Sequence, residues 1–151
     1  MVADLRAGLP FPAGSFAAAV GIHVLQDLAY LDVVPVLREL HRVLRPGAVL
    51  RLGLPDLDRA LAAYRRNDAA YFHVPDADAA SLGGKLVAQL VWYGAVRTPF
   101  TFDCAAEMLG KAGFSTVRRC AFGETASGDP ELASLDDRAR ESLFVEAERG
   151  P

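Results

Sequence analysis

The stretch AAVGIHVLQDLAYLDVVPVLRELHRVLRPGAVLRLGL, residues 18–54, carries the strongest structural signal in this chain. It begins with a short apolar run, Ala18–Ile22, and ends with a second one, Ala48–Leu54, which only Arg51 and Gly53 interrupt. Runs of this length are typical of buried parallel strands. Between them, apolar side chains recur at the spacing of an amphipathic helix, at Val36, Leu37, Leu40, Val43 and Leu44. A strand, a helix and a strand in this order predict a right-handed crossover unit of an α/β fold.

Local signals mark the ends of this predicted helix. Asp32 is a good N-cap, and Pro46-Gly47 is expected to stop the helix before the second strand. Arg51 stands inside an otherwise apolar strand. Because an unpaired buried guanidinium is expensive, we expect Arg51 to meet a carboxylate or water in a crevice.

Two further strands are predicted in the last third of the chain, at Thr116–Phe122 and Ser142–Glu148. The connection between them, Gly123–Glu141, is unusually long. A connection of that length is either functional or ordered by contacts of its own.

Three further helices are predicted after the second strand. Asp56 is expected to cap a helix that carries Leu57, Leu61 and Tyr64 on one face, and a less regular helical stretch covers residues 79–93. The segment Asp103–Ala112 is the clearest, with a stripe formed by Ala105, Met108, Leu109 and Ala112 and with Gly113 as its stop.

Composition limits the classes of protein that fit. The chain has 151 residues, of which 52% are hydrophobic, so one domain with a real core is expected. The 16 basic and 19 acidic residues give a net charge of −3, which predicts no nucleic-acid partner. No apolar run is long enough to span a bilayer and no signal peptide is visible, so no membrane association and a cytoplasmic location are expected. Cys104 and Cys120 are expected to be free thiols, and no metal site is predicted.

Several short motifs follow one another along the chain. They are Asp4-Leu5, Leu9-Pro10-Phe11-Pro12, Gly14-Ser15-Phe16, His23-Val24-Leu25, Arg42-Val43-Leu44-Arg45-Pro46-Gly47, Leu109-Gly110-Lys111-Ala112-Gly113-Phe114 and Leu143-Phe144-Val145-Glu146-Ala147. This succession resembles the C-terminal portion of the class I S-adenosylmethionine-dependent methyltransferases over nearly the whole chain. The sequence departs from the family pattern at Gln26-Asp27, where Glu-His is common, at Ala17 in place of Asp, and at Ala48 in place of a second Gly.

The resemblance implies a fold. The four strands correspond to the fourth, fifth, sixth and seventh of the family's Rossmann-like sheet, lying in the order four, five, seven, six, with the last antiparallel and with helices on both faces. Residues 1–151 are then a single truncated domain, in which residues 64–102 are expected to form an acceptor-side cap. An aromatic-lined substrate pocket and a satellite core under a helical cap are both compatible with the aromatic residues there.

The resemblance also implies that one part of the family's site is missing. In the family an earlier strand and a glycine-rich turn hold the methionine end of the cofactor, and only three residues precede Asp4. We therefore expect weak or absent S-adenosylmethionine binding by this chain alone. The strand Ala18–Ile22 would lack a neighbour on one side, so we expect a homodimer or a partner chain to cover that edge.

The resemblance places three residues in the cofactor-binding region: Asp4, Leu5 and His23. Asp4 and Leu5 match the segment that contacts the adenine, and His23, at the end of the first strand, is also the candidate catalytic base. A terminal residue without a ligand and a structural histidine are the alternative interpretations of Asp4 and His23.

Two functions remain open from the sequence. The first is transfer of a methyl group from S-adenosylmethionine to an unknown small-molecule acceptor, with the chain incomplete or inactive on its own. The second is a non-catalytic methyltransferase remnant that acts as a homodimerising or interaction module through the exposed edge of Ala18–Ile22.

Overall fold

A computed structural model describes residues 4–151 and contains one four-stranded sheet in the order β1-β2-β4-β3. Strands β1 (Phe16–Ile22) and β2 (Leu44–Pro55) are parallel. Strand β4 (Ser142–Arg149) is antiparallel to β2 and to β3 (Phe114–Cys120). The predicted strand order, with an antiparallel last strand, is confirmed. Within the described residues β1 pairs with β2 alone, so its other edge carries no strand.

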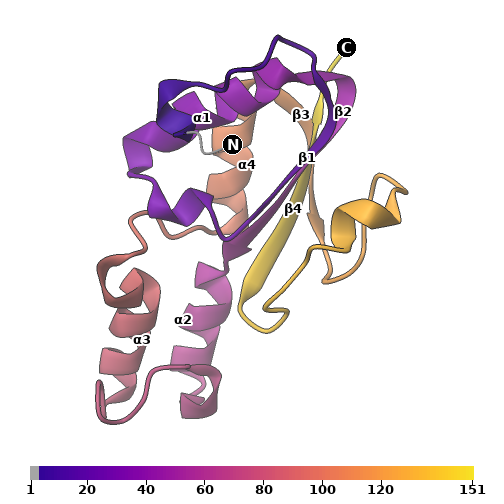
Figure 1. Ribbon diagram of the computed structural model, residues 1–151. Helices are drawn as coiled ribbons and strands as arrows, with labels where there is room; N and C mark the ends of the chain where they lie inside the picture. Colours follow the sequence, from indigo (N-terminus) through magenta and orange to yellow (C-terminus); the bar gives the residue numbers. More distant parts are fainter. Residues whose placement is uncertain (1–3) are drawn as a thin grey trace.

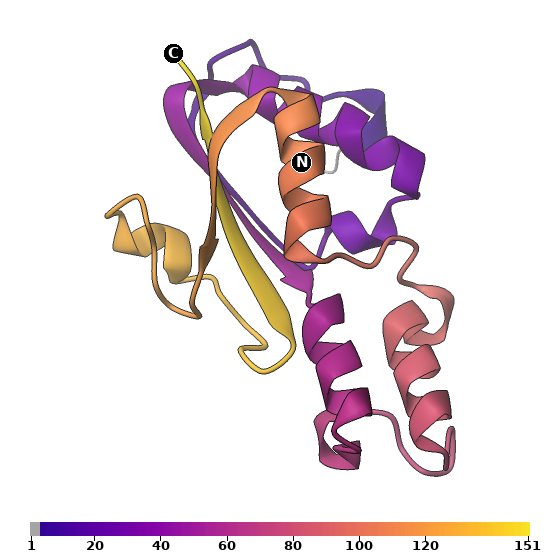
Figure 2. The same cartoon turned by 180° about the vertical axis from the view of Figure 1, so that it is seen from behind.

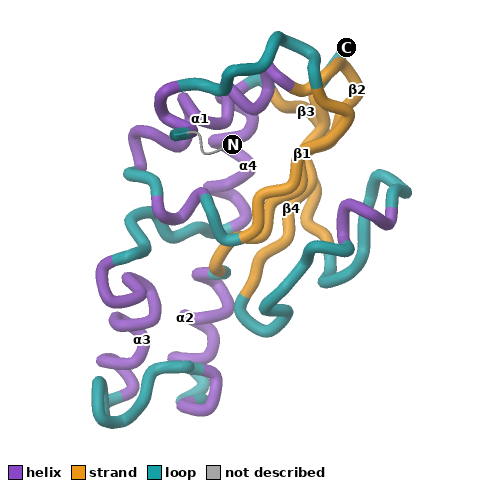
Figure 3. The backbone as a smooth tube through the Cα atoms, viewed as in Figure 1, coloured by secondary structure: helices purple, strands orange, loops and turns teal. Residues whose placement is uncertain are grey.

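The helices are arranged unequally about the sheet (Figures 1 and 2). Helices α1 (Tyr30–Val43) and α4 (Phe102–Ala112) lie on one face, and the 123–141 connection with its short helix η5 (Pro130–Ala133) lies on the other. Helices α2 (Leu57–Arg65) and α3 (Leu82–Val91) stand side by side beyond the sheet. Outside these elements most of the chain is loop, drawn in teal in Figure 3. These loops contain four short 3-10 helices: η1 (Leu5–Ala7), η2 (Leu25–Asp27), η3 (Ala69–Tyr71) and η4 (Trp92–Gly94).

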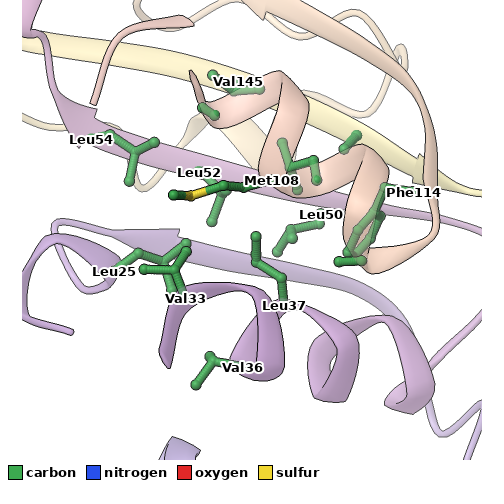
Figure 4. Packing of buried hydrophobic residues seen from close by; sticks show 14 of the residues in the cluster. Leu25, Val33, Val36, Leu37, Leu50, Leu52, Leu54, Met108, Phe114 and Val145 are labelled. Carbon is green, nitrogen blue, oxygen red and sulfur yellow. The ribbon is translucent and has the colours of Figure 1, made fainter. Parts of the chain in front are cut away.

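The main core lies between β2 and the pair α1 and α4. Alternate residues of β2 point into it, and Leu50, Leu52 and Leu54 are all at most 2% exposed. Figure 4 shows these leucines next to Val33 and Leu37 of α1 and Met108 of α4. The predicted stripe of α4 is buried at all four positions, and Gly113 ends the helix with a φ of +104°. This core fixes the carboxyl end of β2 relative to both helices.

Helix α1 begins earlier than predicted. Its N-cap is Ala29, and Asp32 lies in the first turn, so the prediction of Asp32 as the cap is wrong. A carboxylate in the first turn still interacts favourably with the positive end of the helix dipole.

Pro46-Gly47 lies inside a strand and does not separate the helix from it. Helix α1 ends at Val43 and β2 begins at Leu44, four residues before the predicted start. The register between β1 and β2 shifts there, because Phe16 faces Leu44 whereas Ala18 faces Val49. Such an irregularity accommodates a proline without a donor and a glycine with a φ of +76°.

Two smaller corrections concern β3 and α2. Strand β3 begins and ends two residues before the predicted Thr116–Phe122. Helix α2 is capped by Asp56 as predicted, but it buries Ala60 and Ala63 and not the predicted leucine and tyrosine face. Small side chains are needed on that face because Leu82, Leu86 and Leu90 pack against it.

The hairpin of α2 and α3 has a small core of its own. It contains Ala60, Ala63, Tyr71 and Phe72 and is separate from the main core. Tyr71, Phe72 and the leucines of α3 thus contribute to a satellite core together with α2, whereas the role of residues 64–102 as an acceptor-side cap stays a prediction. No helix within residues 4–151 has the length and apolar character needed to cross a membrane.

Candidate functional site

A cavity of about 240 Å³ lies where β1 and β2 end and the α2–α3 hairpin begins. Crevices at the carboxyl ends of parallel strands are the usual ligand sites of open α/β sheets. The walls come from the ends of both strands, from the hairpin and from the 123–141 connection. They are formed by His23, Gln26, Asp27, Pro55, Asp56, Leu57, Ala60, Tyr71, Gln89, Leu90, Trp92, Ala95, Val96, Pro99, Arg138 and Glu141.

His23 follows β1 directly and is held in this cavity from two sides. Its backbone N–H donates to the Gly53 carbonyl at 2.8 Å, and its φ is +52°, in the left-handed region that few non-glycine residues adopt. Its Nε2 lies 2.8 Å from the Ser142 hydroxyl. Unusual backbone conformations persist where surrounding contacts enforce them, often at functional sites. The position of the imidazole is thus fixed by β2 and β4 together.

The contacts of Ser142 allow the tautomer of His23 in which Nε2 carries the proton. The Ser142 hydroxyl also lies 3.4 Å from the Asp137 carbonyl, to which only a hydroxyl proton can be donated. When it donates there, the oxygen accepts from His23 Nε2–H, and Nδ1 keeps its lone pair. Burial lowers the pKa of His23, and the nearby Arg138 lowers it further. The ring is therefore neutral near pH 7, and in this tautomer it can accept a hydrogen bond or a proton through Nδ1.

Two other ionisable groups in the walls, Asp56 and Tyr71, are less suited than His23 to act as a base. The Asp56 carboxylate accepts from the Arg59 backbone N–H at 3.1 Å and from Arg119 at 2.6 Å. Burial raises the pKa of Tyr71 to about 12, an effect that the charge of Asp56 reinforces, so this phenol stays protonated. The contacts of Asp56 and the raised pKa of Tyr71 leave His23 as the better candidate for a base.

The 123–141 connection forms one wall and is anchored beneath the sheet by Arg51. This guanidinium is fully buried and donates to Asp136 at 2.8 and 2.5 Å and to Glu146 at 2.7 Å. The prediction of a carboxylate partner for Arg51 is confirmed. The two carboxylates also accept backbone N–H groups, Asp136 from Gly123 and Glu146 from Ala126 and Ser127. The connection is thus ordered by a buried charge cluster.

The ordered connection brings Arg138 and Glu141 to the cavity. The Glu141 carbonyl accepts from the Asp56 backbone N–H at 2.8 Å, which ties the connection to the start of α2. The Glu141 carboxylate lies 3.3 Å from His73 and 4.0 Å from Arg138. Neither residue was singled out from the sequence, because both lie in the long connection and meet the cavity only through tertiary contacts.

Gln26 was also missed as a site residue, although the sequence marked it as a departure from the family pattern. The residue is only 6% exposed, and its carbonyl accepts from the N–H groups of Arg97 and Thr98 at 2.8 and 3.0 Å. Its side-chain Oε1 is buried and has no hydrogen-bond partner among residues 4–151. Few buried polar atoms in native proteins are left in that state.

Asp4 and Leu5 lie apart from this cavity. Leu5 lines a second hollow of about 260 Å³ against α1, which His23 does not reach. The Asp4 carboxylate accepts from the Arg6 side chain at 3.0 and 2.8 Å, and these hydrogen bonds lower the pKa of Asp4 to about 2. The structure therefore does not bring the three predicted cofactor residues into one pocket, and their cofactor contacts stay a prediction.

Comparison with known proteins identifies the fold. The methyltransferase-domain family model matches residues 1–52. An S-adenosylmethionine-dependent methyltransferase from Mesorhizobium loti has 23% identity and a TM-score of 0.55, over 97% of this chain and 68% of its own. The Haloferax volcanii complex of the Trm112 methyltransferase activator contains a protein described as a methyltransferase. That structure has 15% sequence identity and a TM-score of 0.61, and the match covers 100% of this chain and 61% of the other. The structure of PigF with SAH has 17% sequence identity and a TM-score of 0.56, and the match covers 97% of this chain and 38% of PigF.

These comparisons confirm the resemblance to class I S-adenosylmethionine-dependent methyltransferases and the Rossmann-like fold that it implies. No curated protein matches the chain. The chain spans 43% and 60% of the length of two further solved neighbours, so these structures contain a large portion without a counterpart here.

Proposed function

Because the chain has the class I methyltransferase fold and its first 52 residues match that domain family, we propose that it provides the acceptor side of an S-adenosylmethionine-dependent methyltransferase. The observation that carries this proposal is the cavity at the ends of β1 and β2, with a neutral, oriented histidine in its wall. A single, partly buried base at a strand end suits a reaction in which the acceptor must lose a proton.

The residues of the chain would act mainly by positioning and by accepting that proton. The cavity walls would hold the acceptor in line with the methyl group, and proximity and alignment contribute much of the rate in such reactions. His23 Nδ1 would take the proton that the acceptor releases. When bound, S-adenosylmethionine supplies an electrophilic methyl group.

The fit of the cofactor to this chain is partial. Asp4 and Leu5 are suited to an adenine, since a carboxylate accepts hydrogen bonds from an exocyclic amine. Asp4 would first have to release Arg6, with which it makes three hydrogen bonds. We therefore propose weak or absent cofactor binding by this chain alone, and a second polypeptide segment that completes the site. A neighbour with SAH bound supports the type of cofactor.

Calorimetry with S-adenosylhomocysteine tests this proposal. We expect a dissociation constant in the millimolar range or weaker for the chain alone, about −4 kcal/mol or less favourable. The coding DNA directly upstream of Met1 should then be read for a strand followed by a glycine-rich turn, and the extended chain should bind at least about 100-fold more tightly, roughly 2.7 kcal/mol. Tight binding by the unextended chain would refute the incomplete site, and methyl transfer unaffected by His23→Asn would refute the role of the histidine.

A second candidate function is a non-catalytic module that associates through β1. The free edge of this strand favours it, because Ala18, Val20 and Ile22 are apolar, only partly buried and uninterrupted by charge. We propose a second copy of the chain, or a partner chain, as the cover of this edge. The Haloferax volcanii neighbour, which was solved in a complex with an activator, supports a partner of this kind.

Light scattering after size exclusion measures this association. We expect a dimer, and we expect Val20→Lys to give a monomer, because lysine on an edge strand opposes strand pairing. Val87→Lys is the matched control, since Val87 is 61% exposed on α3 and should leave the dimer intact. A wild-type monomer at all concentrations would contradict self-association.

We also propose a cytoplasmic location. Cys104 and Cys120 are both free, which is usual in reducing compartments.

A further inference from the structure

The second ring nitrogen of His23 is accessible and has no partner. Nε2 lies beside the Ser142 hydroxyl, whereas Nδ1 makes no hydrogen bond within residues 4–151. Among the residues of this range that are not exposed, Gln26 Oε1 is the one side-chain nitrogen or oxygen that is fully buried without a hydrogen bond. Nδ1 is therefore not fully buried, and a ligand in the cavity that His23 lines can contact it. In the tautomer with the proton on Nε2, this nitrogen offers a lone pair to a donor.

The three carboxylates of the cavity walls are offset by three guanidinium groups. The carboxylates belong to Asp27, Asp56 and Glu141, and the guanidinium groups belong to Arg59, Arg119 and Arg138. Asp56 lies 3.3 Å from Arg59 and 2.6 Å from Arg119, and Glu141 lies 4.0 Å from Arg138. Asp27 is exposed, so water and salt screen its charge. The walls thus offer no net charge to a ligand, and a charged ligand would lose its hydration there without a counter-charge.

Most of the remaining wall is apolar. It consists of the side chains of Leu57, Ala60, Tyr71, Leu90, Trp92, Ala95, Val96 and Pro99. Burial against such a surface favours a ligand with an apolar body. The volume of about 240 Å³ lies below the usual range for drug-sized ligands, about 300–1,000 Å³, so the ligand must be small.

A hydroxyl group meets the conditions that these walls set. It is uncharged, and it can donate a proton to an imidazole nitrogen. A hydroxyl is also a weak nucleophile until an adjacent base takes its proton, so a base in the wall is of direct use to it. A neutral amine attacks with a lone pair that it already has, and a carboxylate has no proton to release.

We infer that the acceptor bound in this cavity is a small, uncharged alcohol or phenol with an apolar body, whose O–H group donates to His23 Nδ1. This inference rests on the proposed function for the identity of the ligand as methyl acceptor. The hydroxyl proton passes to His23 Nδ1, and the oxygen forms a bond to the methyl carbon as the sulfur–carbon bond of S-adenosylmethionine breaks. The electron pair of that bond stays on sulfur, which becomes a neutral thioether.

A matched set of probes tests the head group alone. Benzyl alcohol, benzyl methyl ether, benzylamine and benzoate share one body, and each is titrated into the full chain while NMR shifts are recorded. We expect the alcohol to bind at least about fivefold more tightly than the ether, roughly 1 kcal/mol, because the ether has no proton to donate. It should bind at least about tenfold more tightly than either charged probe, roughly 1.4 kcal/mol. A smaller preference over any of the three would overturn the inference, and so would the absence of binding by all four.

The imidazole contact is tested at His23 itself. In the wild-type chain the alcohol should shift the ring nitrogen signals of His23, and unchanged signals on binding would overturn the assignment. His23→Gly removes the ring and suits the local φ of +52°, because glycine adopts positive φ without strain. The preference for the alcohol over the ether should disappear in this variant. His41→Gln is the matched control, because His41 lies on α1 outside the cavity, and it should keep the preference.

Folding of each variant is checked by its melting temperature. A preserved preference for the alcohol in a folded His23→Gly variant would overturn the role of Nδ1. Where that variant does not fold, the ring nitrogen shifts of the wild-type chain decide the question.

The charge balance of the walls is tested on β3. Arg119→Gln removes one of the two guanidinium groups that contact Asp56 and should tighten benzylamine binding at least about threefold relative to the alcohol. Arg118→Gln is the matched control, because Arg118 is exposed on the same strand and outside the cavity. An unchanged ratio in a folded Arg119→Gln variant would contradict the selection of uncharged ligands by these walls.

The binding and transfer readouts separate two failures. Alcohol binding without methyl transfer by the extended chain would refute the proposed function and leave the ligand class of the cavity standing. Methyl transfer to amine or carboxylate acceptors, with no alcohol binding, would refute this inference and leave the proposed function standing.

Discussion

His23 and Arg51 are two basic residues of the same sheet whose pKa values move in opposite directions. Burial lowers the pKa of His23, and no carboxylate within residues 4–151 forms an ion pair with the ring that would offset this effect. Burial acts on Arg51 in the same direction, but the hydrogen bonds from it to Asp136 and Glu146 outweigh that effect and raise its pKa. Arg51 is therefore always charged and has a structural role, whereas His23 can exchange a proton near neutral pH.

The lowered pKa of His23 predicts how stability depends on pH. The unfolded chain binds a proton at this residue near the ordinary value of 6.5, whereas the folded chain binds it only at lower pH. The contribution of His23 to the free energy of unfolding should thus be fully present above pH 6.5 and be lost as the pH falls below that value. In His23→Asn the melting temperature should fall less between about pH 7.5 and about pH 5.5, and asparagine tolerates the left-handed backbone.

Thermal denaturation followed by circular dichroism measures this difference. Burial also lowers the pKa of His41, but that residue is present in both proteins and contributes equally to both curves. Parallel curves for the two proteins would contradict a lowered pKa at His23.

Single residues were only partly predictable from the sequence. The need of Arg51 for a carboxylate follows from its apolar surroundings, but its partners lie 85 and 95 positions further along the chain, and no local pattern points to them. Gln26 and Ser142 are ordinary polar residues in the sequence. Their importance arises only where Thr98 and His23 approach them.

At the scale of elements, Gly53 of β2 lets the side chains of Ile22 on β1 and Phe144 on β4 pack closely over β2. A Cβ at this position would lie 3.0 Å from Ile22 Cδ1 and 3.3 Å from Phe144 Cε1. Gly53→Ala should therefore destabilise the chain by about 1–3 kcal/mol, as overpacking does. Gly110→Ala is the matched control, because it adds a methyl group in open space on α4 and should stabilise by about 0.5–1 kcal/mol. Urea denaturation of both variants measures the two free energies, and equal effects would contradict the packing argument.

Elements with strong periodicity were predicted well, and those shaped by their neighbours were not. Helix α4 has both a complete apolar stripe and a glycine stop, so its predicted range is wrong by one residue only. Strand β2 starts earlier than predicted because pairing with Phe16 extends it past a proline and a glycine. The buried face of α2 was missed because leucines on α3 decide it.

At the scale of the whole molecule, the two cores should differ in stability. The main core joins β2, α1 and α4, whereas the core of the α2–α3 hairpin consists of four buried residues. Regions with fewer buried apolar contacts open more often. Amide hydrogen exchange should therefore be faster in residues 57–91 than in α1, β2 and α4. Equal protection in both regions would show that the hairpin and the sheet open as one unit.

Asp56 is the residue at which the hairpin meets the sheet. Its carboxylate caps α2 and accepts a hydrogen bond from Arg119 of β3. Its backbone N–H donates to the Glu141 carbonyl, and its backbone forms an isolated β-bridge with Phe100. A substitution there would alter the thermal resistance of the chain and the shape of the cavity that Asp56 lines in the same step. Natural selection on either property would consequently act on the other, and the two traits would evolve together.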